Sequence, residues 1–341
     1  MKYSRKVAAA ALIVMSVVAF AKTSHFASGE KLHHKTLPSR RFAFQYVVHV
    51  PPLPAGNGKT RIWIPLPPSD QHQRIESLRI ASPVPCRITQ EKQYGNRLAY
   101  CAHAGALVRK HFDITLTFVA QRFEYKVALP LGDPSSSSGE FPADVARFLQ
   151  PDHLVPINGV IGELSRDETA GIADPVQKAR KIYDYVIQTM HYDHDGAGWG
   201  RGDAVWACSS HHGNCTDFHS LFIGLVRAAG IPARFDIGFP LSLNQHQGTI
   251  SGYHCWAEFY VQGAGWIPID AVEAWQMPER RNYFFGALDQ NRIRFSRGRD
   301  LILSPAQAGN AVNYIVYPYA EVNGKPFANL GHEFSFRGLE P

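Results

Sequence analysis

Cysteine is scarce in this sequence, which contains only Cys86, Cys101, Cys208, Cys215 and Cys255 among 341 residues. No two of them stand in a C-x-x-C spacing, so the paired motifs that hold structural zinc are excluded. Five is an odd number, and at least one thiol therefore stays unpaired even if disulfides form. The composition, with 45% hydrophobic residues, also excludes a disordered or fibrous chain.

The sequence carries only a small excess of positive charge. The formal net charge is +6, and three of the positive charges lie within the first six residues, which leaves a scattered excess of +3. Nucleic-acid-binding proteins gather basic residues on one face, so this balance argues against a nucleic-acid partner.

Long apolar runs are also rare. Residues 7–20 form the longest, and it is too short to span a bilayer comfortably. A basic start precedes this run, and the small-x-small triplet Ala19-Phe20-Ala21 ends it, which predicts a signal peptide over residues 1–21. We therefore expect an exported protein, periplasmic or secreted, without stable membrane insertion after cleavage. An uncleaved anchor is the alternative.

Strand patterns dominate the first half of the chain. Apolar residues alternate from Phe42 to Val50, and further alternating runs follow at 111–120 and 123–128. Proline pairs and a Tyr94-Gly95-Asn96 turn separate the runs. These signals predict an antiparallel β-sandwich.

The second half begins with helical patterns. Asp174 followed by Pro175 is typical of a helix start. A second helix is predicted to begin at Cys215, because apolar residues recur at Phe218, Leu221, Phe222, Leu225 and Val226, and Gly230 then ends it. Cys215 would lie where unpaired N–H groups and the helix dipole lower the pKa of a thiol.

Two later strands offer partners for such a thiol. Alternation along residues 253–260 places His254 on one face with Trp256 and Glu258, and Cys255 on the other face, which makes Cys255 a poor nucleophile. Asp270 ends the following strand and could orient the imidazole. A simple hairpin would leave Asp270 offset from His254 along the strands, so a bulge, a strong twist or splayed strand ends would be needed.

Three blocks carry a resemblance to a known family. Cys215-Thr216-Asp217, residues 254–258 (HCWAE) and residues 265–270 (GWIPID) resemble the transglutaminase-like superfamily. The resemblance implies an α+β fold with a papain-like core, in which the helix that carries the cysteine packs on an antiparallel sheet. It implies that Cys215 is the nucleophile, His254 the general base and acid, and Asp270 the residue that orients the imidazole.

Secondary site candidates and a domain plan complete the prediction, and the first of these candidates comes from the resemblance. Tyr192 matches an aromatic that helps to hold the oxyanion, although the backbone N–H of Cys215 is the safer donor. Trp256 is expected to serve in packing or as a groove wall, not as a catalytic group. Asp217 either complements the helix dipole or contacts substrate. The expected organisation is a signal peptide (1–21), a lead-in (22–40), a β-sandwich (41–130), a linker (131–142), a catalytic core (143–278) and a C-terminal β-rich extension packing on the core (279–341).

If Cys215 is the unpaired thiol, Cys86–Cys101 and Cys208–Cys255 are the attractive disulfides, although four cysteines allow three connectivities. The expected activity is that of a thiol enzyme, a cysteine protease or amidase, acting on a peptide or protein substrate without a metal or cofactor. Hydrolysis is favoured over acyl transfer to an amine (a crosslinking transglutaminase).

Two further readings are weighed against this one. A catalytically silent binding or scaffold protein of the cell envelope would keep the same fold. A metal site would use the histidines at 191, 194, 211, 212 and 219. The arginines at 292, 294, 297 and 299 are expected to form a solvated strand face, with binding of an acidic substrate group as the alternative.

Overall fold

The computed structural model describes residues 37–52, 59–104, 110–129 and 140–340, and Leu37–Pro341 cluster as one unit. The predicted signal peptide, most of the lead-in and most of the 131–142 linker lie outside the described residues. Within the described ranges, no helix has the length and apolar character needed to cross a membrane.

Two antiparallel five-stranded sheets form the β-rich part of the chain. The first has the order β11-β18-β1-β6-β3 and the second β17-β16-β2-β5-β4. In β1 the even positions from Phe42 to Val50 are buried, as the alternation predicts, and they share a hydrophobic core with Ile62, Ile64 and Leu66 of the second sheet. The strands of the two sheets are β1 (Ser39–Val50), β2 (Lys59–Leu66), β3 (Gln73–Ala81), β4 (Cys86–Gln90), β5 (Arg97–Ala104), β6 (Phe112–Phe123), β11 (Gln247–Thr249), β16 (Tyr319–Val322), β17 (Lys325–Pro326) and β18 (Gly331–Gly338).

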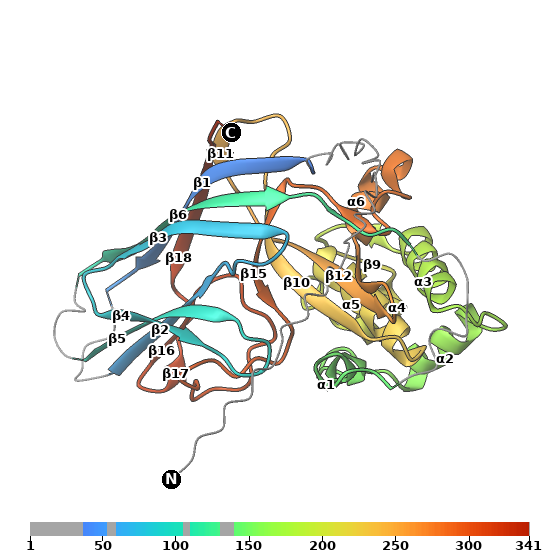
Figure 1. Cartoon of the computed structure of the whole chain (residues 1–341). Helices are drawn as coiled ribbons and strands as arrows, with labels where there is room; N and C mark the ends of the chain where they lie inside the picture. The colour runs from blue at the N-terminus through green and yellow to red at the C-terminus, as the bar shows by residue number, and fades with distance from the viewer. Residues whose placement is uncertain (1–36, 53–58, 105–109, 130–139, 341) are drawn as a thin grey trace, which may run out of the picture. The chain divides into compact units, whose positions relative to one another are not determined.

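The C-terminal segment differs from the expected extension on the core. Strand β18 pairs with β1 from Phe42↔Gly338 to His49↔Gly331, and β16 pairs with β2. In Figure 1 the red C-terminal strand β18 accordingly runs beside the blue β1. The end of the chain therefore completes both sheets that its beginning starts. Sequence patterns missed this because strand pairing between distant segments leaves no local signal.

The core sheet has the order β13-β12-β10-β15. Helix α5 (Cys215–Ala228) packs against β12 and β10, while α2, α3 and α4 contact its other sides (Figure 1). Every residue from Cys215 to Arg227 is consequently buried, so the helix is covered all round rather than on one face. The elements of this part are β10 (Ala233–Pro240), β12 (His254–Val261), β13 (Gly265–Ile269), β15 (Arg292–Arg297), α2 (Gly159–Glu168), α3 (Pro175–Thr189), α4 (Ala204–Ser210) and α6 (Ala271–Gln276).

Short elements connect these layers. They are β7 (Tyr125–Lys126), α1 (Ala143–Ala146), the 3₁₀ helix at Arg147–Leu149, β8 (His191–Tyr192), β9 (His212–Gly213), the 3₁₀ helix at Pro278–Arg280 and β14 (Ala287–Leu288). The predicted start of α3 is confirmed, because the Asp174 side chain accepts a hydrogen bond from the Gln177 N–H at 2.8 Å and Pro175 follows it.

Candidate active site

Cys215 is the first residue of α5, and a capping box holds it there. The Asn214 side chain accepts a hydrogen bond from the Thr216 N–H at 2.9 Å, and the Asp217 carboxylate accepts one from the Asn214 N–H at 2.9 Å. Among the described residues, no hydrogen bond engages the N–H of Cys215 itself. That N–H remains available to a negatively charged oxygen.

His254 and Asp270 meet although the strand register does not place them opposite each other. Pairing of β12 with β13 reaches Ala257↔Ile269, so its continuation would set Asp270 beside Trp256. Strand β13 ends at Ile269, however, and Asp270 becomes the N-cap of α6, accepting a hydrogen bond from the Glu273 N–H at 3.0 Å. Its other oxygen, Oδ2, lies 2.7 Å from Nε2 of His254. The departure of the chain from the sheet thus removes the expected offset.

The imidazole of His254 connects this carboxylate to the thiol. Because Nε2 is bound to Asp270, Nδ1 is the ring nitrogen left for the hydrogen bond between His254 and Cys215. Both side chains are buried, with 7% of His254 and 2% of Cys215 exposed. The three residues therefore form a continuous Cys–His–Asp array.

Opposing effects set the charges of this array. Burial raises the pKa of the Cys215 thiol, but hydrogen bonds from Cys255 and His254 and the positive charge of His254 outweigh it and lower the pKa to about 6. Burial lowers the pKa of His254, but the charge and hydrogen bond of Asp270 raise it to about 10. A thiolate–imidazolium pair is thus favoured at neutral pH.

Arg292 is a member of the site that the sequence patterns missed. Its Nη1 donates to Asp270 Oδ2 at 2.7 Å, the oxygen that also binds His254, and its guanidinium lies 5.1 Å from the Trp256 ring centroid. Burial opposes the charge of Asp270, yet the charges of His254 and Arg292 hold the pKa of this carboxyl far below its usual range. Asp270 therefore stays ionised at any physiological pH.

The expected solvated arginine face is wrong. Arg292, Arg294 and Arg299 are each less than 10% exposed. Arg297 forms a two-pronged ion pair with Asp236 at 2.6 and 2.7 Å. The charged side chains of β15 pair with carboxylates from distant segments, namely Asp270, Asp70 and Asp236, and no local sequence pattern identifies such partners.

His219 supports Cys215 from one turn further along α5. Its Nδ1–H donates to the Cys215 carbonyl at 2.7 Å, and its Nε2 accepts the Ala271 N–H at 3.1 Å. Burial lowers the pKa of His219 to about 4, so the ring is neutral. It ties the helix start to the segment that carries Asp270. Among the described residues, no group with metal-ligand geometry includes His191, His194, His211, His212 or His219.

Cys255 corrects two expectations. Cys86 and Cys101 form a disulfide, but Cys208, Cys215 and Cys255 carry free thiols, so the expected Cys208–Cys255 pair is wrong. The pleat does turn Cys255 away from the His254 face, as predicted. That other face is the one α5 covers, however, so Cys255 is buried against this helix, its Sγ lies 3.5 Å from Nδ1 of His219, and it lowers the pKa of the Cys215 thiol.

The three secondary candidates take different positions. Burial raises the pKa of Tyr192, as does the nearby charge of Cys215, and its ring lies 6.2 Å from Phe218 of α5. Its hydroxyl has no hydrogen bond among the described residues, so it can face a substrate. Trp256 is only 1% exposed and packs against the Arg292 guanidinium, which fits the packing role among its predicted alternatives.

Asp217 has a structural role. Its carboxylate accepts hydrogen bonds from the N–H groups of Gly200 at 2.6 Å, Gly202 at 2.9 Å and Asn214 at 2.9 Å. All of its side chain is buried, so the substrate-contact alternative is wrong. Gly213 has a φ of +140°, and a Cβ there would lie 2.4 Å from the Asp217 carboxylate, so glycine is required at this turn.

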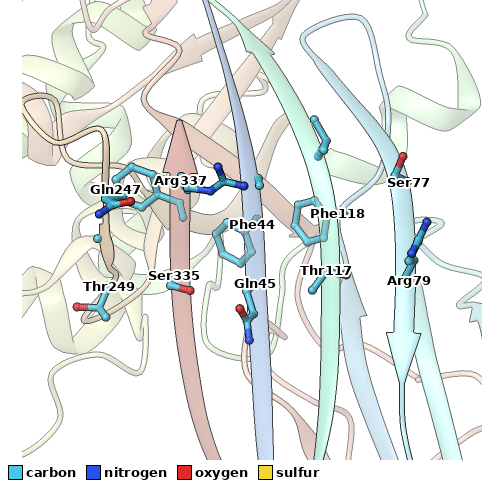
Figure 2. A pocket seen from close by; sticks show the side chains of 14 residues that line it. Phe44, Gln45, Ser77, Arg79, Thr117, Phe118, Gln247, Thr249, Ser335 and Arg337 are labelled. Atoms are coloured by element: carbon cyan, nitrogen blue, oxygen red, sulfur yellow. The ribbon is translucent and has the colours of Figure 1, made fainter. Parts of the chain in front are cut away.

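A groove of about 640 Å³ lies elsewhere, on the sheet that contains β1. Figure 2 shows its side chains arranged across β18, β1, β6 and β3, with Gln247 and Thr249 from β11 at one side. It includes none of Cys215, His254 and Asp270. This groove is therefore not the site of the Cys–His–Asp array, despite its volume.

Comparison with known proteins places this geometry in context. Residues 162–271, which include the whole array, match the model of the transglutaminase-like superfamily. An uncharacterized protein of Haemophilus influenzae is 27% identical over 310 residues, covering 80% of this chain and 84% of the relative. A crystal structure from Cytophaga hutchinsonii, named "Putative Cysteine Protease", superimposes with a TM-score of 0.59 at 18% identity, covering 89% of this chain and 92% of that one. The expected α+β fold is confirmed.

Proposed function

Because the chain carries a transglutaminase-like superfamily domain, we propose that it is a cysteine enzyme that cleaves peptide-like amide bonds through a thioester. The observation that carries the proposal is the array in which the His254 ring lies 2.7 Å from the Asp270 carboxylate and its positive charge lowers the pKa of the buried Cys215 thiol. A buried thiol with a pKa near 6 beside an imidazolium is the arrangement that makes cysteine a nucleophile at neutral pH.

The reaction follows from this geometry. The Cys215 thiolate attacks the amide carbonyl carbon, and the carbonyl oxygen becomes negatively charged within reach of the Cys215 N–H. The His254 imidazolium gives its proton to the amide nitrogen, the C–N bond breaks, and the amine leaves a thioester on Cys215. Asp270 holds the imidazole in one orientation throughout, while Arg292 keeps that carboxylate ionised and fixed.

The second half of the reaction needs an acyl acceptor. Neutral His254 takes a proton from a water molecule, whose oxygen attacks the thioester carbon; the C–S bond then breaks, the carboxylic acid leaves, and the Cys215 thiolate and His254 imidazolium are restored. A primary amine in place of water would give a crosslinked product. Hydrolysis is our proposal because water is abundant and the sequence offers no recognisable amine site.

Export is part of the proposal. A disulfide such as Cys86–Cys101 persists in oxidising compartments and is rare in the cytosol. The disulfide and the predicted signal peptide together support a periplasmic or secreted protein with a peptide or protein substrate.

Two measurements test the proposed function. Iodoacetamide at neutral pH followed by peptide mapping should label Cys215 ahead of Cys208 and Cys255, and labelling should slow in His254→Ala. Mass spectrometry of a peptide pool should then show cleavage products that Cys215→Ala does not form, with amine adducts only where amine is added. Slow labelling of Cys215, or equal products from Cys215→Ala, would contradict the proposal.

A further inference from the structure

A second cavity, which is lined mainly by polar side chains, lies between the β-rich part and the core sheet. It has a volume of about 390 Å³. The turn at Asp70–His72 and residues Arg122 and Tyr125 line one side, and the other side comes from β10, β12 and β15. Trp256 and Glu258 line it from the face of β12 that sequence alternation assigns to His254. Asp70 and Gln71 are exposed, so the cavity opens at that turn.

Most charges in this cavity are already neutralised. Arg294 pairs with Asp70 at 2.6 Å, and Arg297 pairs with Asp236 at 2.6 Å. Arg234 pairs with Glu258 at 2.6 Å. The charges of these three arginines and three carboxylates thus balance. The ion pairs also hold the three arginine side chains in position.

Arg122 is the cation without a counterpart. It is only 2% exposed, its Nε has no hydrogen-bond partner, and no carboxylate of the described residues lies within ion-pair distance of its guanidinium. Burying an unpaired charge is strongly unfavourable, so a guanidinium kept in this position calls for an anion.

His72 supplies a second unsatisfied group on the same wall. Its ring stacks on Tyr125 with 3.6 Å between centroids, and its buried Nε2 has no hydrogen-bond partner. Burial and the charge of Arg122 lower the pKa of His72 to about 4, so the ring is neutral and offers one N–H donor. A guanidinium and a neutral N–H that line the same cavity match the oxygens of one small oxyanion.

We infer that this cavity binds an oxyanion, a carboxylate or a phosphate group, through Arg122 and His72. The pairs around it would hold the site in shape and exclude a second anion by their own carboxylates. The inference rests on the geometry of the cavity and does not depend on the proposed catalysis.

Thermal unfolding of the whole protein tests the inference. Millimolar inorganic phosphate or sodium acetate should raise the melting temperature above that in sodium chloride of equal ionic strength, because an anion that binds only the folded state stabilises it. A peptide with a free C-terminal carboxylate, compared with its amide, distinguishes a substrate group from free phosphate. Absence of any shift beyond that of chloride would overturn the inference.

Variants assign the effect to the cavity. Arg122→Met should weaken anion binding by roughly tenfold or more, the worth of one charge-assisted hydrogen bond. In sodium chloride, Arg122→Met should have a melting temperature no lower than that of the native protein, because the substitution removes an unpaired buried charge. His72→Phe keeps a ring against Tyr125 and should also weaken binding. Arg74→Met, whose side chain is 68% exposed, is the matched control and should bind normally. Unchanged binding in both cavity variants would refute the site, and His72→Phe decides if Arg122→Met fails to fold.

Discussion

Arg292 and His254 hydrogen-bond the same oxygen of one carboxylate, each at 2.7 Å from Asp270 Oδ2. The three groups are buried, and their charges hold one another in place. The orientation of the imidazole therefore depends on a strand, β15, that follows the matched superfamily segment in the sequence.

Arg292→Gln should lower the free energy of unfolding by about 3 kcal/mol, because it removes one of the two cations that pair with the buried Asp270 carboxylate. Denaturation in urea measures this change. Arg74→Gln, at an exposed position, is the control and should change stability by less than about 0.5 kcal/mol. Equal stability of the two variants would show that the buried pair contributes little.

The rate of Cys215 alkylation should rise as the pH rises through about 6. The thiol has its pKa lowered to about 6, so it is protonated and slow below that pH and reactive above it. His254, whose pKa is raised to about 10, loses its proton above that value, and the leaving amine then lacks an acid. The ratio kcat/KM should accordingly form a bell between about pH 6 and 10. A labelling midpoint near that of an ordinary thiol, about 8.5, would contradict the ion pair.

Cys255 should tune the reactivity of Cys215 without being the nucleophile. Its hydrogen bond lowers the pKa of the Cys215 thiol, so Cys255→Ala should move the alkylation midpoint upward by about one pH unit, the equivalent of one hydrogen bond.

Cys255→Ser is the matched variant for this prediction. Its hydroxyl keeps a donor of similar size, and the midpoint should stay within a few tenths of the native value. The same midpoint in Cys255→Ala and the native protein would rule out a role for this thiol.

The Cys86–Cys101 disulfide should stabilise the protein without affecting catalysis. It joins residues 15 positions apart, and a loop of this length corresponds to about 3 kcal/mol. The double variant Cys86→Ser/Cys101→Ser should melt at a lower temperature and keep the alkylation rate of Cys215. Cys208→Ser removes a thiol outside any disulfide and should leave the melting temperature unchanged.

Local signals predicted much of the fold and the array. Cys215 follows a capping residue and begins a periodic helix, and His254 and Asp270 stand in blocks that resemble a known family. The pairing of Asp270 with Arg292 could not be predicted, because 22 residues separate them and α6, a 3₁₀ helix and β14 lie between. The resemblance ends before β15, so it offered no guide to this partner.

Cys255 shows a different limit. Alternation correctly separated it from His254, but a strand has two faces and the sequence does not say what covers each. The packing of α5 on β12 brings Cys255 to the thiol that it was expected to avoid. Likewise, the sequence shows four arginines in and beside β15 but not the distant carboxylates that pair with Arg292, Arg294 and Arg297.

The pairing of β18 with β1 has a consequence for biosynthesis. Until residues 331–338 have emerged, β1 presents an open edge along most of its length, and such edges recruit other strands. Folding must wait for contacts between the two ends of the described chain, which makes it slow compared with that of a protein with local contacts. A truncation before Gly331 should therefore aggregate even though Cys215, His254 and Asp270 are all present.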